Sequence, residues 1–180
     1  MSTVTKINVP TAQEVSPQNQ EIFKNLESAL SFVPNLYATM AHSNTALGSF
    51  LTFANSETSF DNKEKEVIDL AISNVNECSY CQAAHTAIAK MNGFTDEQAL
   101  ELRKGGASWD SKLNTLARIS RSFAQNRGRV SDELKQEFFN AGYNNENFID
   151  LVVRAGVINI TNTLHNFTEV EVDFPAVPAV

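Results

Sequence analysis

The chain has 180 residues, of which 42% are hydrophobic and 19% are charged, and its formal net charge is −7. This length and balance suit one globular domain that can bury a core without staples. The acidic charge, with no run of Lys and Arg, gives no reason to expect a nucleic-acid partner. No apolar stretch resembles a signal peptide or reaches the roughly 20 residues of a membrane span. We therefore expect a cytoplasmic protein with no membrane partner.

The first third of the chain carries helix signals. Ser16 followed by Pro17 is typical of an N-cap and first helical position, and helical spacing of apolar residues continues to Leu30. Pro34 then interrupts the pattern, and residues 35–55 indicate a short helix, a turn and another helix.

Two consecutive helices are predicted in the next part of the chain. Asp61 and Glu64 form a capping box at the start of the first, which carries an apolar stripe of Val67, Ile68, Ala71, Ile72 and Val75. The second is expected to begin near Glu77 and to run to about Met91, with Gly93 as its stop.

The remaining segments also have helical patterns. A capping box at Thr95 opens a short helix, and residues 108–126 form an amphipathic one. Ser131 caps a further helix that stops at Gly142. The longest helical run is 145–169, although its β-branched residues could locally suit a strand.

No segment shows sustained alternation of apolar and polar residues with hairpin turns. We therefore predict an all-α fold of seven to nine helices in a single compact domain over residues 1–180. Its redox core is expected at about 60–100, and its ends, 1–14 and 170–180, are expected to be extended.

The only two cysteines lie in "NECSYCQAAHTAIAKMNGF", residues 76–94. Cys78 falls in the first turn of its predicted helix, where unpaired N–H groups and the helix dipole favour a thiolate. Cys81 and His85 follow at one-turn intervals on the same face. The two sulfurs could form a disulfide, and the histidine could take or return a proton, so this segment is a candidate redox centre.

Other readings of the two cysteines remain open. A zinc site needs four ligands, so His42, His165 or a carboxylate would have to join the two cysteines and His85. A covalent haem site would need a histidine where Gln82 stands. A thioredoxin-like dithiol would follow a strand, and a helix is predicted here. The cysteines could also be buried small residues without chemistry.

The stretch "KEKEVIDLAISNVNECSYCQAAHTAIAKMNGFTDEQ", residues 63–98, resembles the AhpD-like branch of the carboxymuconolactone decarboxylase family. That family's pattern of a glutamate, then C-x-x-C, then a histidine four residues on falls on Glu66, Cys78, Cys81 and His85. Taken alone, Glu66 would be read as a solvated helical residue. The resemblance implies that it is instead a catalytic base.

The resemblance extends through "NTLHNFTEVEVDFP", residues 162–175, to longer peroxidase-related members. It implies an all-helical fold, a homo-oligomer and alkylhydroperoxidase or related thiol-redox activity. Decarboxylase-like members lack the dithiol, which argues against lactone decarboxylation. Tyr80 stands where better-characterised AhpD proteins have a second histidine. With a pKa near 10, tyrosine is a poor proton shuttle, so a different rate or reductant is expected.

The expected reaction is reduction of an organic peroxide or hydrogen peroxide. Glu66 and His85 take the proton from Cys81, whose thiolate attacks the peroxide and becomes a sulfenic acid. Cys78 condenses with it to a disulfide, which an external dithiol of lipoyl or thioredoxin type reduces. The helix dipole instead favours Cys78 as the attacking sulfur. No cofactor or metal is expected, and the alternative is a non-catalytic redox-sensing or disulfide-exchange oligomer.

Overall fold

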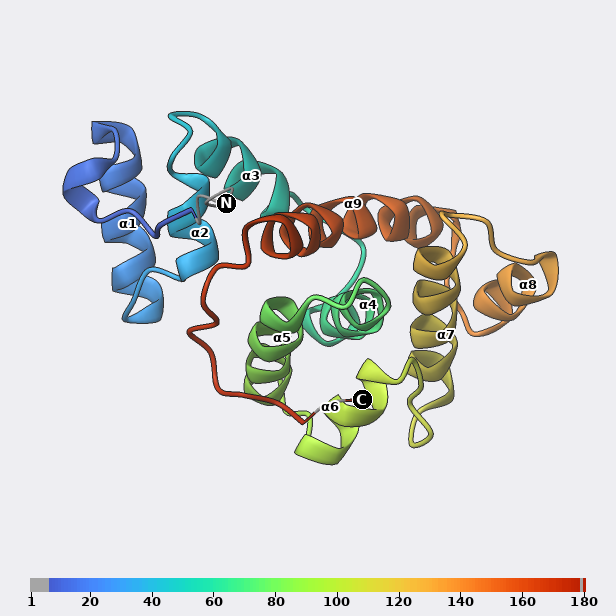
Figure 1. Cartoon of the computed structure of the whole chain (residues 1–180). Helices are drawn as coiled ribbons and strands as arrows, with labels where there is room; N and C mark the ends of the chain where they lie inside the picture. The colour runs from blue at the N-terminus through green and yellow to red at the C-terminus, as the bar shows by residue number, and fades with distance from the viewer. Residues whose placement is uncertain (1–6, 179) are drawn as a thin grey trace, which may run out of the picture. The chain divides into compact units, whose positions relative to one another are not determined.

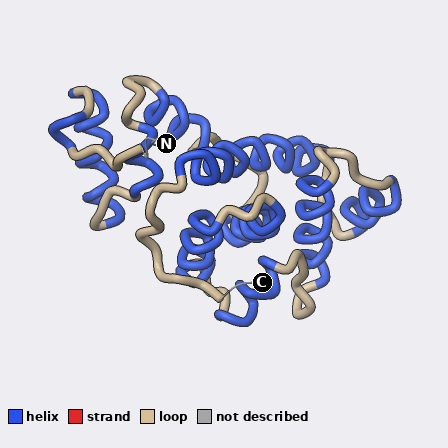
Figure 2. The backbone as a smooth tube through the Cα atoms, viewed as in Figure 1, coloured by secondary structure: helices blue, strands red, loops and turns tan. Residues whose placement is uncertain are grey.

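The computed structural model describes residues 7–178 and 180, and within this part it contains helices and no strand (Figure 2). The all-α prediction is confirmed. After a 3₁₀ turn, Ala12–Glu14, the helices in chain order are α1 (Pro17–Leu30), α2 (Asn35–Met40), α3 (Ala46–Ala54), α4 (Asn62–Val75), α5 (Ser79–Met91), α6 (Asp96–Arg103), α7 (Ser111–Gln125), α8 (Asp132–Asn140) and α9 (Asn145–Thr168).

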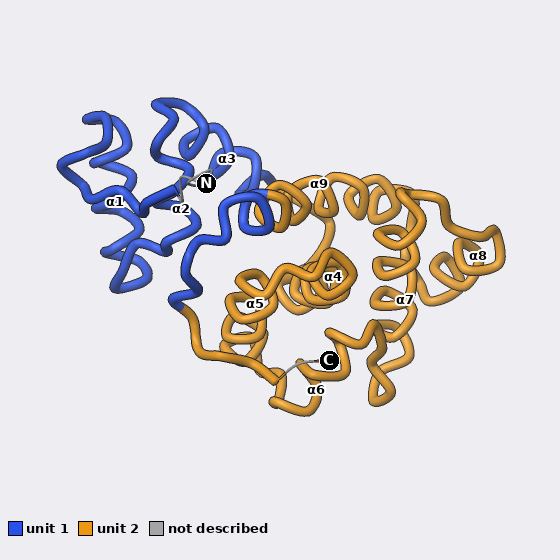
Figure 3. The backbone as a smooth tube through the Cα atoms, in the orientation of Figure 1, with its two compact units in different colours: residues 1–56, 164–173 blue, residues 57–163, 174–180 orange. Residues whose placement is uncertain are grey.

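Contacts divide the chain into two compact units, shown in two colours in Figure 3. The first comprises Met1–Ser56 and Leu164–Asp173, and the second comprises Glu57–Thr163 and Phe174–Val180. The single domain expected over residues 1–180 stays a prediction.

The first unit contains α1, α2 and α3 around buried apolar side chains that include Phe23 and Leu47. Asn19 fixes the turn between α2 and α3, since its buried amide donates to the Ala41 carbonyl at 3.1 Å and to the Ser43 carbonyl at 3.0 Å. The sequence predicted an extended start over residues 1–14, but Ala12–Glu14 form a 3₁₀ turn. In this turn the Glu14 carboxylate accepts a hydrogen bond from the Thr11 N–H. Residues 1–6 of that prediction lie outside the described residues.

The second unit is built around α4, which packs against α5, α6 and α7, while α8 packs on α7 (Figure 1). All residues of α4 from Glu66 to Ser73 are buried. The sequence predicted an amphipathic helix with one apolar stripe, whereas neighbours cover the stretch Glu66–Ser73 on all sides. A helix buried all round is normally apolar all round, so the acidic residues within it need a specific explanation.

The junction between α4 and α5 is two residues later than predicted. Glu77 adopts a left-handed conformation with φ of 54° and follows the α4 C-cap. Its N–H donates to the Asn74 carbonyl at 3.1 Å, and the Cys78 N–H donates to the Ser73 carbonyl at 3.0 Å. These are the two bonds of a Schellman motif, usually made with glycine at this position. Glu77 therefore closes α4, and α5 begins only at Ser79.

Several predicted helix signals are confirmed. Ser16 and Ser131 accept from backbone N–H groups at their helix starts, and the Asp61 capping box has both of its bonds, at 2.8 Å and 3.1 Å. Gly93 follows α5 with φ of 91°. The β-branched run of α9 is helical, and no helix in the described part is long and apolar enough to cross a membrane.

The described residues after Thr168 form neither helix nor strand, as expected. The Phe174 ring lies edge-on to Tyr80 with centroids 5.6 Å apart, and the Pro178 carbonyl accepts from the Arg103 guanidinium. The last residues therefore pack on α5 and α6 of their own chain.

Candidate active site

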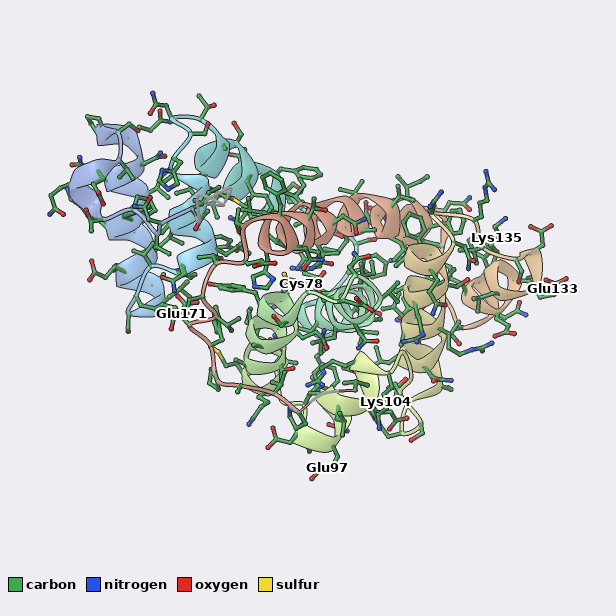
Figure 4. All side chains as sticks on the ribbon, in the orientation of Figure 1. Cys78, Glu97, Lys104, Glu133, Lys135 and Glu171 are labelled. Atoms are coloured by element: carbon green, nitrogen blue, oxygen red, sulfur yellow. The ribbon has the colours of Figure 1, made fainter. Side chains whose placement is uncertain are left out.

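Cys78 is the N-cap of α5 and not a residue of its first turn. Its Sγ accepts from the Cys81 N–H at a distance of 3.2 Å, so the sulfur satisfies one of the unpaired donors at the helix start. Figure 4 labels Cys78 at this end of α5. Both cysteines are free thiols. The Schellman motif therefore fixes Cys78 on one side, and the first turn of α5 fixes it on the other.

Both cysteines are buried, with Cys78 0% and Cys81 2% exposed. Polar groups nevertheless surround the sulfurs, since the Asn162 side chain hydrogen-bonds Cys78 and the Thr161 hydroxyl hydrogen-bonds Cys81. Asn162 is itself held in place, because its amide donates to Ser73 Oγ at 3.1 Å and its oxygen accepts from Asn76 at 2.8 Å. The dithiol therefore has buried polar surroundings that side chains of α4, α5 and α9 supply.

The two thiols share one hydrogen bond, and this bond shifts their pKa values in opposite directions. The hydrogen bond from the Cys81 thiol lowers the pKa of Cys78, against the effect of burial, and the backbone N–H of Cys81 and the Asn162 amide add to the lowering. The same hydrogen bond, burial and the charge on Cys78 raise the pKa of Cys81, while His85 opposes that rise. Cys78 is thus the more acidic of the two thiols and accepts the hydrogen bond of the Cys81 thiol.

His85 connects α5 to the acidic residues of α4. Its Nδ1 lies 2.9 Å from Glu66 Oε2 and 3.4 Å from Asp69 Oδ2. Asp69 is completely buried, and both of its carboxylate oxygens accept from the Arg154 guanidinium of α9, one of them at 2.9 Å. One imidazole, two carboxylates and one guanidinium therefore form a continuous charged network beside the dithiol.

The carboxylates hold a proton on His85. Burial by itself lowers the pKa of the imidazole, but the attraction of Glu66 and Asp69 outweighs burial and raises the pKa to about 9. Arg154 opposes this rise. At neutral pH, His85 is therefore an imidazolium, which can donate a proton and stabilise a neighbouring thiolate.

The ligand atoms of Glu66, Asp69 and His85 lie within 4.8 Å of one another, as in some metal sites. A cation there would compete with Arg154, which already binds both oxygens of Asp69. It would also have to displace the proton of His85. These contacts suit an ion-pair network better than a metal centre.

The four residues singled out from the sequence fall in one region. His85 contacts Glu66 directly and carries the charge that acts on Cys81, which hydrogen-bonds Cys78. Glu66 is 4% exposed, so its reading as a solvated residue is wrong.

Sequence reasoning missed Asp69, Arg154 and Asn162. One signal was available for Asp69, since it lies one helical turn after Glu66 within an otherwise apolar run. Nothing in the sequence pointed to the two residues of α9, whose contribution depends on how that helix crosses α4.

The other histidines lie in the first unit. His42 is exposed, and its Nε2 pairs with the Asn8 carbonyl at 2.8 Å. His165 is in the last turn of α9 and is 9% exposed, and its contact with the dithiol stays a prediction.

Comparisons with known proteins agree with this fold. Residues 39–117 match the carboxymuconolactone decarboxylase family, whereas no curated protein matches the sequence. A peroxidase-related protein from Silicibacter sp. TM1040 is 19% identical, with a TM-score of 0.81 over 94% of this chain and 92% of that one. A peroxidase-related protein with an alkylhydroperoxidase AhpD core, from Ralstonia eutropha JMP134, is 17% identical, with a TM-score of 0.84 over 96% and 94%.

A third similar structure is the debrominase Bmp8, solved as a cysteine-to-alanine variant in complex with 2,3,4-tribromopyrrole. It is 15% identical, with a TM-score of 0.77 over 96% of this chain and 93% of that one. At these identities the solved structures establish the fold.

The all-helical chain has the fold of an alkylhydroperoxidase AhpD core. Within this fold, residues 39–117 are the part of the chain that is similar to the carboxymuconolactone decarboxylase family.

Proposed function

We propose that this protein is a thiol-dependent peroxidase that reduces hydrogen peroxide or an organic hydroperoxide through a cycle of Cys78 and Cys81. The observation that carries the proposal is the 2.9 Å pairing of His85 with Glu66 next to two hydrogen-bonded thiols. The proposal takes Cys78, the more acidic of the two thiols, as the thiolate, with the Cys81 thiol and the His85 imidazolium as proton donor beside it. Two-electron reduction of a peroxide needs all three.

The first half of the proposed cycle forms a sulfenic acid. Cys81 passes its proton along the shared hydrogen bond to Cys78, and the Cys81 thiolate attacks the terminal oxygen of the peroxide. The O–O bond breaks, and the His85 imidazolium protonates the departing alkoxide to an alcohol. Cys81 is proposed as the attacking sulfur because the charge of His85 acts on it. Glu66 and Asp69 keep the imidazole charged until that step.

The second half closes and then reopens a disulfide. The Cys78 sulfur attacks Cys81, the S–O bond breaks, and the hydroxyl leaves as water with the proton of Cys78. An external dithiol of lipoyl or thioredoxin type then reduces the Cys78–Cys81 disulfide. The two protons of the external dithiol go to Cys81 and to His85. Cys81 is then again a thiol, His85 an imidazolium and Cys78 a thiolate. The cycle therefore balances without a cofactor or metal, and it suits the reducing cytoplasm, where the dithiol is the resting form.

The deciding experiment is a single turnover followed by a steady-state assay. The fully reduced protein is mixed with excess cumene hydroperoxide, and cumyl alcohol, free thiols and the Cys78–Cys81 bond are measured by chromatography, thiol titration and mass mapping. We expect one alcohol formed and two thiols lost per chain. In the steady state, dihydrolipoamide or reduced thioredoxin should sustain turnover. Alcohol formation without loss of the two thiols would contradict the cycle.

Variants separate the roles of the four residues. Cys78→Ser should leave a sulfenic acid on Cys81 that can be trapped with dimedone, whereas Cys81→Ser should abolish peroxide consumption. The reverse result would make Cys78 the attacking sulfur. Glu66→Gln should slow turnover at least about tenfold. Glu77→Gln, an exposed glutamate of the same segment, is its matched control and should leave turnover unchanged.

A non-catalytic redox sensor is the second candidate, and the burial of both sulfurs favours it. Peroxide reaches buried sulfurs only when the groups that cover them move, so this candidate has slow, stoichiometric oxidation. This candidate predicts that the disulfide forms once and that no dithiol sustains turnover. Tribromopyrrole is a useful added substrate in the same assay because the similar debrominase was solved with it.

A further inference from the structure

A second pocket lies within the same unit, away from the dithiol. Its volume is about 620 Å³, and α5, α6 and the segment Pro175–Pro178 form its walls. Ala83, Thr86, Ala87 and Lys90 line it from α5. Their spacing puts them on one face of the helix, opposite to the face that carries Cys81 and His85. Figure 4 shows Glu97 of α6 well apart from Cys78, which lies where α5 begins.

Arg103 lines this pocket, although it is only 1% exposed. Its guanidinium donates to the Pro178 carbonyl, while its Nε has no hydrogen-bond partner among residues 7–178 and 180. Burial lowers the pKa of this guanidinium, which nevertheless stays charged. A buried cation normally pairs with an anion, because removing its charge from water is costly.

The acidic residues at the pocket do not supply that anion. Asp96 pairs with Lys90 at 2.8 Å, and Glu97 accepts from its own helix start through Thr95 and a backbone N–H. Within the described chain, no carboxylate lies in ion-pair distance of Arg103. The cationic end of the pocket therefore has a charge that the neighbouring side chains leave unbalanced.

Thr86 adds a second polar group to the same pocket. Its Oγ1 is buried and has no partner among the described residues. The rest of the lining is mostly apolar and includes Met91, Leu100 and Val177. A pocket of this size, with an apolar body and a few polar groups, is typical of a site for a small organic ligand.

We propose that this pocket binds a small organic monocarboxylate with an apolar body. The Nε and an Nη of Arg103 can donate two parallel hydrogen bonds to a carboxylate, which takes over from the Pro178 carbonyl. The Thr86 hydroxyl donates a third, and the hydrocarbon part lies against Met91 and Leu100. A monoanion fits better than a phosphate dianion, since one guanidinium is available and Asp96 and Glu97 repel extra negative charge.

Octanoate is a suitable probe, and isothermal titration calorimetry with the whole protein at neutral pH is the measurement. Saturable binding is expected, with octanol, which lacks the charge, binding at least about tenfold more weakly. Arg103→Gln should weaken octanoate binding by about tenfold or more. The matched control is Lys104→Gln, which removes the same charge from an exposed neighbour and should bind as the wild type does.

Arg103 is buried, so Arg103→Gln is first checked for folding by circular dichroism. If it does not fold, two other variants decide the question. Ala87→Phe fills the pocket and should abolish octanoate binding. Thr86→Val removes only the hydroxyl and should weaken octanoate binding. Octanoate that fails to bind the wild type, or binds these variants equally well, overturns the proposal. The double variant Cys78→Ser/Cys81→Ser should retain binding, because the site is separate from the dithiol. Loss of binding there overturns it too.

Discussion

Asp69 has no exposed surface and interacts with charge on two sides. It accepts two hydrogen bonds from Arg154, and its Oδ2 lies 3.4 Å from His85 Nδ1. A buried carboxylate is tolerated only with such partners. Asp69 therefore helps to keep His85 charged and in place, and in the proposed reaction it acts only through that residue.

Replacing Asp69 should cost both stability and activity. Asp69→Asn leaves the Arg154 charge without its partner, so we expect the free energy of unfolding to fall by about 3 kcal/mol. Urea denaturation followed by circular dichroism measures this. Adding Arg154→Met should recover part of the loss. The matched control, Asp132→Asn, removes a carboxylate whose side chain is 94% exposed and should change little. An Asp69→Asn protein as stable as the wild type would contradict the network.

The charge of His85 predicts a dependence of stability on pH. Its pKa is raised from an ordinary 6.5 to about 9, so the folded state holds the proton more tightly than the unfolded one. This stabilisation is fully present below about pH 6.5 and is lost as the pH rises through about 9.

The pH effect is best measured in Cys78→Ser/Cys81→Ser, where no thiol titrates. The free energy of unfolding should fall by up to about 3 kcal/mol between pH 6.5 and 9. Adding His85→Gln to that background should remove this part of the slope. An unchanged slope would show that His85 does not carry the proton in the folded state.

At the scale of elements, the turn between α4 and α5 sets the position of the dithiol. The left-handed conformation of Glu77 is sterically strained, because its Cβ lies close to the following carbonyl oxygen. The conformation persists because it lets α4 end and Cys78 cap α5 within a few residues.

Glycine at position 77 should relieve this strain. We expect Glu77→Gly to raise the free energy of unfolding by about 0.5 kcal/mol, after the greater backbone freedom of glycine in the unfolded chain is deducted. Denaturant unfolding at constant pH measures the difference. Glu77→Ala keeps the Cβ and should bring no such gain. A loss of stability in Glu77→Gly would mean that the glutamate side chain itself is required.

Helix caps were the elements most accurately predicted. Asp61, Thr95 and Ser131 each cap a helix where the sequence placed one, because a cap depends on local hydrogen bonds between residues three apart. The start of α5 was misplaced by two residues. No glycine marks the turn there, and Glu77 gives no sign of a left-handed conformation.

At the scale of the whole molecule, α9 presents apolar side chains to solvent. Ile149, Val152, Val153 and Ile160 are between 39% and 61% exposed and recur at helical spacing on one face. An interface between two identical copies uses the same patch on both, and such a stripe is complementary to itself. This surface supports the expectation of a homo-oligomer, which stays a prediction.

The oligomer prediction can be tested by sedimentation velocity. The wild-type protein should sediment as more than one copy, and Ile149→Lys/Val152→Lys should shift it toward the monomer. Leu30→Lys, which replaces an exposed apolar residue at the end of α1, is the control and should not change the species. A wild-type protein that sediments as a single chain would contradict the expectation.

The sequence by itself determined that the chain is helical and where most helices start and stop, and it predicted the four residues of the proposed chemistry. These features depend on periodicity, local caps and the short spacing of Cys78, Cys81 and His85 along one helix. Only the tertiary structure decided that the stretch Glu66–Ser73 of α4 is buried on all sides, that Glu66 pairs with His85, and that Asp69, Arg154 and Asn162 complete the site. Those contacts join residues of different helices, and packing brings them together over distances in sequence that no local pattern records.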